Sequence, residues 1–465
     1  MDDEVFQLGA SSQKQTLSIS SSFVQRARPT FWLDLNAANQ VGSSAPYVTQ
    51  LVSIPSSSIV SYTDDGIFRT HDRASLSVIG IFQWEQGGIC SAIKPVQNGF
   101  ISAGKSGMIG YWDARQPTPT ISLQGPSNAP YLSLASSTVD TNTIAAGTEL
   151  QGTDARIDLW DIRKPDVPVL SYLETHSDDI TSLDFHPTLH NILLSAASDA
   201  LIAISDTRQQ NEDDSVVGVI NAGASVARAG WGGSSKVYPK ASPVDDDEEI
   251  SSSASNLPPL GAFYGVSDMQ TVGIWEADGF SELLPVRDVR QTQMETNIPT
   301  HRHWQTEYAI DANYDSSLLE NSESVGLFCG EQNGGMALME IPHDNNNSQS
   351  SSSPNWSLHC LTSGGHADIV RSVTWDPASY ILYSGGEDGR LCAWSLSGDQ
   401  SSAQSNAAAA IATSLDASNN ESNTDSTSDE FGGPGPKRKP LKGSTHSSSP
   451  LHSGRTASSK SYRPY

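Results

Sequence analysis

One short unit recurs along the chain and constrains its fold more than any single motif. In each copy an Asp, Asn or Ser is followed, usually six positions later, by an aromatic residue and then by Asp or another polar residue. In SGGEDGRLCAWS these positions are Asp388 and Trp394. Self-similarity at a fixed period is the sequence signature of repeat architectures, so the number and spacing of the copies predict the fold.

Seven copies can be counted, and we call the residue in the aromatic position the slot. In chain order the slots are His71, Trp112, Trp160, Ser205, Trp275, Met339 and Trp394. The first four lie 41 to 48 residues apart, close to the ~40–45 residues of a four-stranded propeller blade. Short β-branched and aromatic runs alternate with Gly, Pro, Ser and Asp turns, which predicts an all-β fold.

The later gaps between slots are longer because polar segments interrupt them. These inserts lie near 240–259, 297–307 and 342–355. Stretches rich in Ser, Asn and Asp bury too little apolar area to order themselves, so we expect disordered surface loops there. We also expect disorder in the N-terminal segment 1–28 and in the Ser-rich tail 398–465, which leaves residues 29–397 as the folded domain.

The unit resembles the WD40 repeat, in which Gly-His opens a blade and Trp-Asp closes its third strand. The matching dipeptides are Gly365-His366, the variant Thr175-His176, Trp112-Asp113 and Trp160-Asp161. Each is common alone, whereas seven units in register over about residues 47–397 form a specific pattern. The resemblance implies a seven-bladed WD40 β-propeller. We expect PTFWLDLN, residues 29–36, to close the ring as the outer strand of unit seven.

The resemblance also implies a buried hydrogen-bond chain within a blade, made of a His, a Ser or Thr, an Asp and the slot Trp. In unit seven the members of this structural tetrad are His366, Ser384, Asp388 and Trp394. Unit four has the partial set His176, Ser195 and Asp199, because Ser205 occupies its slot. A closed chain of this kind satisfies every buried polar group.

A hydrolase triad is the alternative interpretation of His366, Ser384 and Asp388. A catalytic Ser would be expected on an exposed, strained turn such as G-x-S-x-G. Ser384 instead falls within ILYSGGEDG, which predicts a strand. We therefore expect no enzyme activity, with a hydrolase kept as a remote alternative.

A further motif places an Arg two residues after the Asp that follows a slot. It occurs in WDAR, WDIR and SDTR, and its residues are Trp112, Asp113, Arg115, Trp160, Asp161, Arg163 and Arg208. This motif resembles the W-D-x-R box with which some WD40 proteins dock on the adaptor of cullin-4 ubiquitin ligases. The alternative is that each Arg pairs with acidic neighbours on the rim of the disc.

Charge separates the body of the chain from its tail. The formal net charge is −26, yet residues 437–465 hold seven basic and no acidic residues, which leaves −33 on residues 1–436. Phosphates would be repelled, so we expect no direct nucleic-acid or anionic-membrane binding by the propeller. The basic cluster at 437–442 resembles a nuclear localisation signal, with Lys437, Arg438, Lys439 and Lys442; a basic solubilising tail is the alternative.

Other site classes find little support in the sequence. The four cysteines form no C-x-x-C pair, and His301 and His303 lie in the polar insert THRHWQTE, so we expect no metal and no cofactor. No apolar run approaches the ~18 residues that cross a bilayer. The N-terminus lacks a secretory pattern, which predicts an intracellular protein of the nucleus, the cytoplasm or both.

The function that these features favour is a non-catalytic scaffold for protein–protein interaction, within a nuclear or nucleocytoplasmic complex. We expect a monomer that binds protein or peptide partners and no small-molecule substrate. Acidity would favour basic peptides. The alternative is a substrate receptor of a cullin-4 RING ubiquitin ligase.

Overall fold

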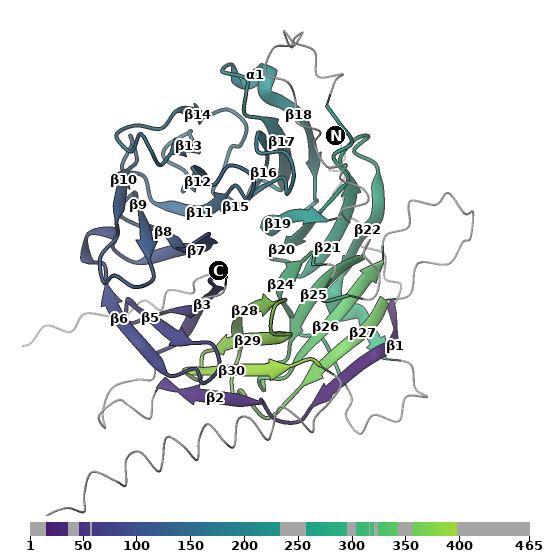
Figure 1. Cartoon of the computed structure of the whole chain (residues 1–465). Helices are drawn as coiled ribbons and strands as arrows, with labels where there is room; N and C mark the ends of the chain where they lie inside the picture. The colour runs from purple at the N-terminus through teal and green to yellow at the C-terminus, as the bar shows by residue number, and fades with distance from the viewer. Residues whose placement is uncertain are drawn as a thin grey trace, which may run out of the picture. The chain divides into compact units, whose positions relative to one another are not determined.

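Seven β-sheets form the folded unit in a computed structural model of the chain (Figure 1). The described residues are 15–35, 46–55, 58–232, 257–294, 304–315, 317–319, 324–342 and 356–397. Each sheet contains four strands that follow one another in sequence, except that β2 completes the seventh sheet and two extra strands extend the sixth. The prediction of a seven-bladed β-propeller is confirmed.

The first three blades follow one another without a large insert. Blade one contains β3 (Val48–Ser53), β4 (Ser58–Thr63), β5 (Ile67–Asp72) and β6 (Val78–Gln83). Blade two contains β7 (Cys90–Val96), β8 (Gly99–Gly104), β9 (Met108–Asp113) and β10 (Ile121–Gln124). Blade three contains β11 (Tyr131–Ser136), β12 (Thr143–Thr148), β13 (Ile157–Asp161) and β14 (Leu170–Tyr172).

The remaining blades carry the longer connections and both N-terminal strands. Blade four contains β15 (Ile180–Phe185), β16 (Ile192–Ala197), β17 (Leu201–Asp206) and β18 (Val216–Asn221), with the short helix α1 (Glu212–Ser215) before β18. Blade five contains β19 (Val226–Gly232), β20 (Ala262–Ser267), β21 (Thr271–Glu276) and β22 (Glu282–Asp288). Blade six contains β24 (Tyr308–Asn313), β25 (Ser324–Gly330), β26 (Met336–Pro342) and β27 (Trp356–Thr362), extended by β1 (Gln15–Arg26) and β23 (Thr292–Met294). Blade seven contains β28 (Val370–Asp376), β29 (Ile381–Gly386), β30 (Arg390–Ser395) and β2 (Phe31–Asp34).

The innermost strands make a closed ring around the centre of the propeller (Figure 1). β3, β7, β11, β15, β19, β24 and β28 each contact the next in this order, and β28 contacts β3. The contact between β28 and β3 joins the last blade to the first. β2, within the segment 29–36 expected to close the ring, pairs antiparallel with β30.

The slot residues all lie in the third strand of their blades and are buried. Their exposed fractions range from 0% for His71, Trp112, Trp160, Met339 and Trp394 to 4% for Trp275. Five of the seven slot residues are apolar and pack in the buried clusters, so apolar packing accounts for most copies of the repeat that is visible in the sequence.

The expectation of disorder over 1–28 is wrong for residues 15–26, which form β1. β1 pairs in parallel with β27 and with β23. Leu17 is fully buried, and the alternation around it in LSIS is the period of a half-buried strand. Serines dilute this apolar pattern, which is why composition alone predicted disorder. Residues 1–14 lie outside the described residues.

A polar contact also joins β1 to blade six. Ser22 Oγ lies 3.3 Å from Nδ1 of His359, whose Nε2 lies 2.5 Å from Oε2 of Glu340. The His359 and Glu340 side chains are buried, at 5% and 7% exposure. The bulge of β1 between Ile19 and Val24 brings Ser22 to this position. β1 is therefore held by hydrogen bonds as well as by apolar burial.

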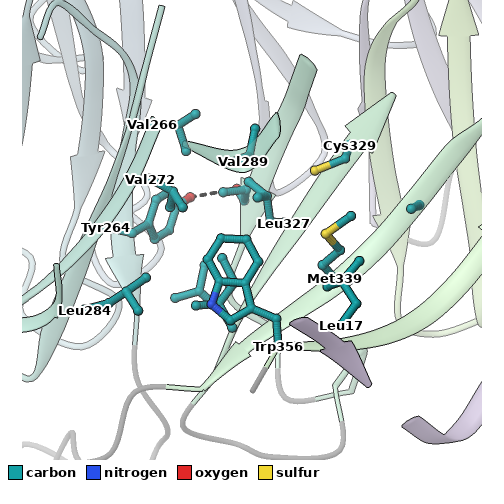
Figure 2. Close-up of a cluster of buried hydrophobic side chains, with 14 of the residues drawn as sticks. Leu17, Tyr264, Val266, Val272, Leu284, Val289, Leu327, Cys329, Met339 and Trp356 are labelled. Atoms are coloured by element: carbon teal, nitrogen blue, oxygen red, sulfur yellow. Dashed lines mark hydrogen bonds between the residues drawn. The ribbon is translucent and has the colours of Figure 1, made fainter. Parts of the chain in front are cut away.

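A buried apolar cluster lies between blades five and six (Figure 2). Trp356 lies in its middle, with Leu17 and Met339 on one side and Tyr264 and Leu284 on the other. The N-terminal strand thus contributes a core side chain to a blade formed more than 300 residues later in the chain. Burial of such side chains stabilises the fold by about 1.5–3 kcal/mol each.

The insert expected to be disordered over 297–307 is ordered at its C-terminal end. Trp304 is 3% exposed and belongs to the cluster of Figure 2, and its indole N–H donates to Thr306 Oγ1 at 3.0 Å. The prediction was wrong here because one aromatic residue in a polar segment buries enough area to anchor it. Residues 295–303, most of the insert at 240–259, the insert after Pro342 and the tail 398–465 lie outside the described residues.

Candidate functional site

The structure brings the four residues of the blade seven tetrad together. His366 precedes β28, Ser384 lies on β29, Asp388 is in the β29–β30 turn and Trp394 lies on β30. His366 Nε2 lies 2.8 Å from Ser384 Oγ, and His366 Nδ1 lies 3.1 Å from Asp388 Oδ1. The Trp394 indole N–H donates to Ser384 Oγ at 2.8 Å. Ser384 therefore connects His366 to Trp394.

One assignment of hydrogens satisfies every donor in this tetrad. Trp394 can only donate, so Ser384 Oγ accepts and its own O–H donates to His366 Nε2. His366 Nδ1–H then donates to Asp388, whose Oδ2 also accepts the Ala367 N–H at 2.8 Å. Burial raises the pKa of Asp388, but the bond and attraction from His366 outweigh it and the pKa is lowered. The Asp388 carboxylate and the Nδ1–H group of His366 thus stabilise each other.

Burial decides what Ser384 can do chemically. Ser384 is 0% exposed, and its hydroxyl is engaged on both sides by His366 and Trp394. A nucleophile must approach a substrate carbonyl closely, which a hydroxyl sealed between strands cannot do. This geometry supports a structural network over a hydrolase triad.

Blade four contains the His–Ser and His–Asp contacts of this network but has no slot Trp to donate to the Ser. His176 Nε2 lies 2.8 Å from Ser195 Oγ, and His176 Nδ1 lies 3.2 Å from Asp199 Oδ2. Ser205 is 1% exposed, and its hydroxyl has no hydrogen-bond partner in the described part of the chain. The side chain in the slot is too short to reach Ser195.

Strand register explains how the other blades resemble or differ from these two. In each blade the slot residue pairs with a residue on the second strand. The residue two positions after that paired residue faces the slot side chain, and in six of the seven blades it lies ten residues before the slot. From blade one to blade seven this residue is Ser61, Ser102, Ala146, Ser195, Gly265, Cys329 and Ser384.

Sequence reasoning missed two of these pairs. Ser61 Oγ lies 2.8 Å from Nε2 of the slot His71, and the slot Trp112 donates to Ser102 Oγ at 2.8 Å. In blade three, Ala146 has no hydroxyl that could accept a hydrogen bond from Trp160 Nε1. A Ser ten residues before a slot was the signal that could have found both pairs.

The arginines of the W-D-x-R motifs fold back on their own aspartates. Arg163 donates to Asp161 through its backbone N–H and its Nε and Nη2 groups, at 3.0, 2.8 and 2.8 Å. Arg115 with Asp113 and Arg208 with Asp206 form the same arrangement, which we call the Asp–Arg clamp. The guanidinium groups lower the pKa of Asp113 and of Asp161 to about 2.

The clamp residues differ in how far they are open to a partner. The side chains of Arg115, Arg163 and Arg208 are 82%, 65% and 44% exposed. Trp112 and Trp160 are 0% exposed, so they serve the core and offer no docking surface.

A fourth clamp, which the sequence analysis did not identify, joins Arg290 to Asp288 after β22. Its three bonds measure 2.8 to 2.9 Å. It follows a fourth strand rather than a slot, so the clamp forms without a preceding Trp. The ends of the first and third strands of a blade lie on one face because neighbouring strands are antiparallel. Arg115, Arg163 and Arg208 therefore lie on that face, which we call the clamp face, and Arg290 lies on the opposite one.

The histidines of the polar insert and the basic cluster of the tail were the remaining predicted sites. His301, His303, Lys437, Arg438, Lys439 and Lys442 lie outside the described residues. In the described ranges no group of three His, Cys, Asp or Glu side chains could hold a metal ion, and no helix is long and apolar enough to cross a membrane. All four cysteines are buried and free, and burial raises the pKa of Cys329 and Cys360 to about 12. These thiols are therefore protonated and unreactive at neutral pH.

Comparison with protein families identifies the two units that contain a His–Ser–Asp set. The model of the family "WD domain, G-beta repeat" matches residues 167–205 and 357–395. These segments cover most of blades four and seven.

The relatives are WD repeat-containing proteins. The chain is 27% identical over 296 residues to an uncharacterized WD repeat-containing protein of Saccharomyces cerevisiae, covering 63% of each chain. It is 25% identical over 305 residues to WD repeat-containing protein GTS1 of Arabidopsis thaliana, covering 64% of this chain and 66% of that one. The chain thus spans less than two thirds of the length of these relatives.

One relative is a homolog of the protein that four segments of this sequence resemble. Segments 145–163, 174–206, 287–291 and 364–394 resemble WD repeat-containing protein 89. The homolog of that protein from Dictyostelium discoideum is 22% identical over 367 residues, covering 78% of this chain and 86% of that one. Among solved structures, a chain in the crystal structure of the mitotic checkpoint complex superposes with a TM-score of 0.55 at 14% identity, over 85% of this chain and 98% of that one. At that identity the likeness concerns the fold alone.

Proposed function

This chain carries WD40 repeats in a seven-bladed propeller, and we propose that it acts as a non-catalytic scaffold for protein partners in a nuclear or nucleocytoplasmic complex. WD40 propellers generally mediate protein–protein interactions. The observation that carries the proposal is the division of roles between interior and surface. Ser384, His366 and the cysteines are buried, while Ile79 and Ile81 on the outer strand β6 are 63% and 62% exposed.

Affinity purification of the full chain from cells, followed by mass spectrometry, tests the scaffold directly. We expect the same protein partners in repeated purifications, and we expect Ile79→Glu with Ile81→Glu to weaken at least one of them. An exposed pair of charges should leave the fold intact, because neither side chain packs in the core. Absence of any reproducible partner would contradict the proposal, as would labelling of Ser384 by an activity-based hydrolase probe.

A second candidate is a substrate receptor of a cullin-4 ligase, and the exposure of Arg115 and Arg163 favours it. A guanidinium held by its own aspartate is pre-oriented, so docking would require no reordering of that side chain. We expect Arg115→Ala with Arg163→Ala to abolish capture of the ligase adaptor in a pull-down. Arg290→Ala is the matched control, because it removes the same clamp from the opposite face. Equal capture by all three proteins would exclude the ligase role.

Nuclear entry through the basic cluster Lys437-Arg438-Lys439 with Lys442 completes the proposal. The cluster is supported by its composition, with no acidic residue after position 436. Residues 430–465 fused to a fluorescent reporter should concentrate it in the nucleus, and replacement of the four basic residues by Gln should abolish this. A purely cytoplasmic signal from the unmodified fusion would contradict it.

A further inference from the structure

A small cavity opens at the C-terminal ends of the innermost strands of blades three to six, on the clamp face. Its volume is about 190 Å³, and its lining includes Asp184, Trp231, Tyr264 and Tyr314. Small-molecule sites usually measure ~300–1,000 Å³. The cavity therefore suits a single side chain better than a cofactor.

Asp184 contributes the charge of the cavity. Its Oδ2 accepts the backbone N–H of Trp231 at 3.2 Å, and no described residue forms an ion pair with it. Burial raises the pKa of Asp184, although the charge of Lys94 and the Trp231 N–H act in the opposite direction. An ionised carboxylate in such surroundings would be stabilised by a cation that enters the cavity.

The aromatic walls are held in place before any ligand arrives. The Trp231 indole N–H donates to the Asp184 backbone carbonyl at 3.2 Å. The Trp231 and His186 rings pack edge-on, with their centroids 4.7 Å apart. The Tyr264 hydroxyl donates to the Ala312 carbonyl at 2.7 Å. Rigid aromatic rings attract cations, and their prior orientation lowers the entropy lost on binding.

We propose that this cavity binds one cationic side chain, lysine or arginine, presented by a basic peptide segment of a protein partner. The proposal rests on the scaffold function and adds the chemistry of the partner. Charge complementarity supports it at two scales, since Asp184 forms no ion pair with any residue that the structure describes and residues 1–436 carry a net charge of −33. The local carboxylate selects the position, and the acidic body attracts the peptide.

Fluorescence anisotropy with labelled octalysine and octaarginine peptides tests the site on the full chain at physiological salt. Asp184→Asn should weaken binding of the tighter probe about tenfold, as expected for loss of a charged hydrogen-bond partner. Asp166→Asn is the matched control, because Asp166 is exposed and the change in net charge is the same. The control should bind within twofold of the unaltered chain. The tighter of the two probes identifies the preferred side chain.

Equal affinities for the Asp184→Asn and Asp166→Asn chains would overturn the proposal, because binding would then depend only on net charge. If Asp184→Asn does not fold, Tyr314→Ala takes its place under the same criterion. A gain in probe affinity after Lys437, Arg438, Lys439 and Lys442 are replaced by Gln, if it is lost when Asp184→Asn is added but kept when Asp166→Asn is added, would assign the cavity to the chain's own tail and overturn a separate partner. If the purification yields reproducible partners but Asp184→Asn does not change peptide binding, the proposed scaffold function is retained and only this binding site is excluded.

Discussion

Blades four and seven begin with the same polar network and complete it differently. The His–Ser contact measures 2.8 Å in both, and the His–Asp contact measures 3.2 Å in blade four and 3.1 Å in blade seven. In blade seven Trp394 adds the last bond to Ser384, whereas in blade four the hydroxyl of Ser205 is buried without a partner among the described residues. One slot residue therefore decides whether the network closes.

The difference shows that burial of the slot residue and hydrogen bonding at the slot are independent features of the repeat. Burial of the slot is common to all seven blades, while the hydrogen bond at the slot depends on a Ser ten residues earlier. Blade three has the Trp without the Ser, and blade four has the Ser without the Trp. Burial at the slot is a feature of every blade, whereas hydrogen bonds at the slot stabilise only particular blades.

The largest expected effect is at the slot of blade seven. Trp394→Ala removes a fully buried ring and its bond to Ser384, so we expect a loss of about 3–5 kcal/mol in the free energy of unfolding. Chemical denaturation of the full chain measures it. The comparison would break if Ser205→Ala, the matched change in blade four, cost as much.

Acid provides the next largest effect, through a third type of slot residue. Burial lowers the pKa of His71 in blade one to about 4, from an ordinary value of 6.5. The unfolded chain then binds a proton that the folded chain does not, so stability falls as the pH falls from about 6.5 to 4, by roughly 3 kcal/mol in total. His71→Gln should flatten the stability–pH curve in this window by about 1.4 kcal/mol per pH unit. His186, with a pKa also lowered to about 4 by burial, keeps its own contribution and serves as the internal reference.

The histidines test whether the shared part of the network has equal weight in both blades. His366→Ala and His176→Ala each remove one hydrogen bond from a buried Ser hydroxyl and one from an Asp carboxylate, so we expect losses of about 1–3 kcal/mol for each. Asp388→Ala should fall in the same range. Unchanged denaturation midpoints for His366→Ala and Asp388→Ala would refute the tetrad.

The smallest expected effect is at Ser205. The buried hydroxyl of Ser205 has no hydrogen-bond partner in the described ranges, so its removal leaves no group there unsatisfied, and Ser205→Ala should be neutral or should stabilise by up to about 1 kcal/mol. A clear loss measured by the same denaturation would show that Ser205 has a partner that the geometry does not reveal.

Local patterns in the sequence predict the blades well because each slot is specified within its own strand. Asp388 and Trp394 stand six residues apart, and the same spacing locates Trp160. β1 could not be predicted in this way, because its contacts reach Trp356, 338 residues away, and Ser-rich composition hides its alternation. Trp304 shows the same limit, since a polar insert concealed one anchoring side chain. The cavity around Asp184 joins residues of several blades, which no single repeat encodes.

The most direct test of the account is the difference in unfolding free energy between Ser384→Ala and Ser195→Ala in the full chain. Ser384→Ala leaves both His366 Nε2 and the Trp394 indole unpaired, whereas Ser195→Ala leaves only His176 Nε2. We therefore predict that Ser384→Ala destabilises the propeller by about 1–2 kcal/mol more than Ser195→Ala. Equal losses, or no loss from Ser384→Ala, would contradict the claim that the tetrad of blade seven is a closed structural network.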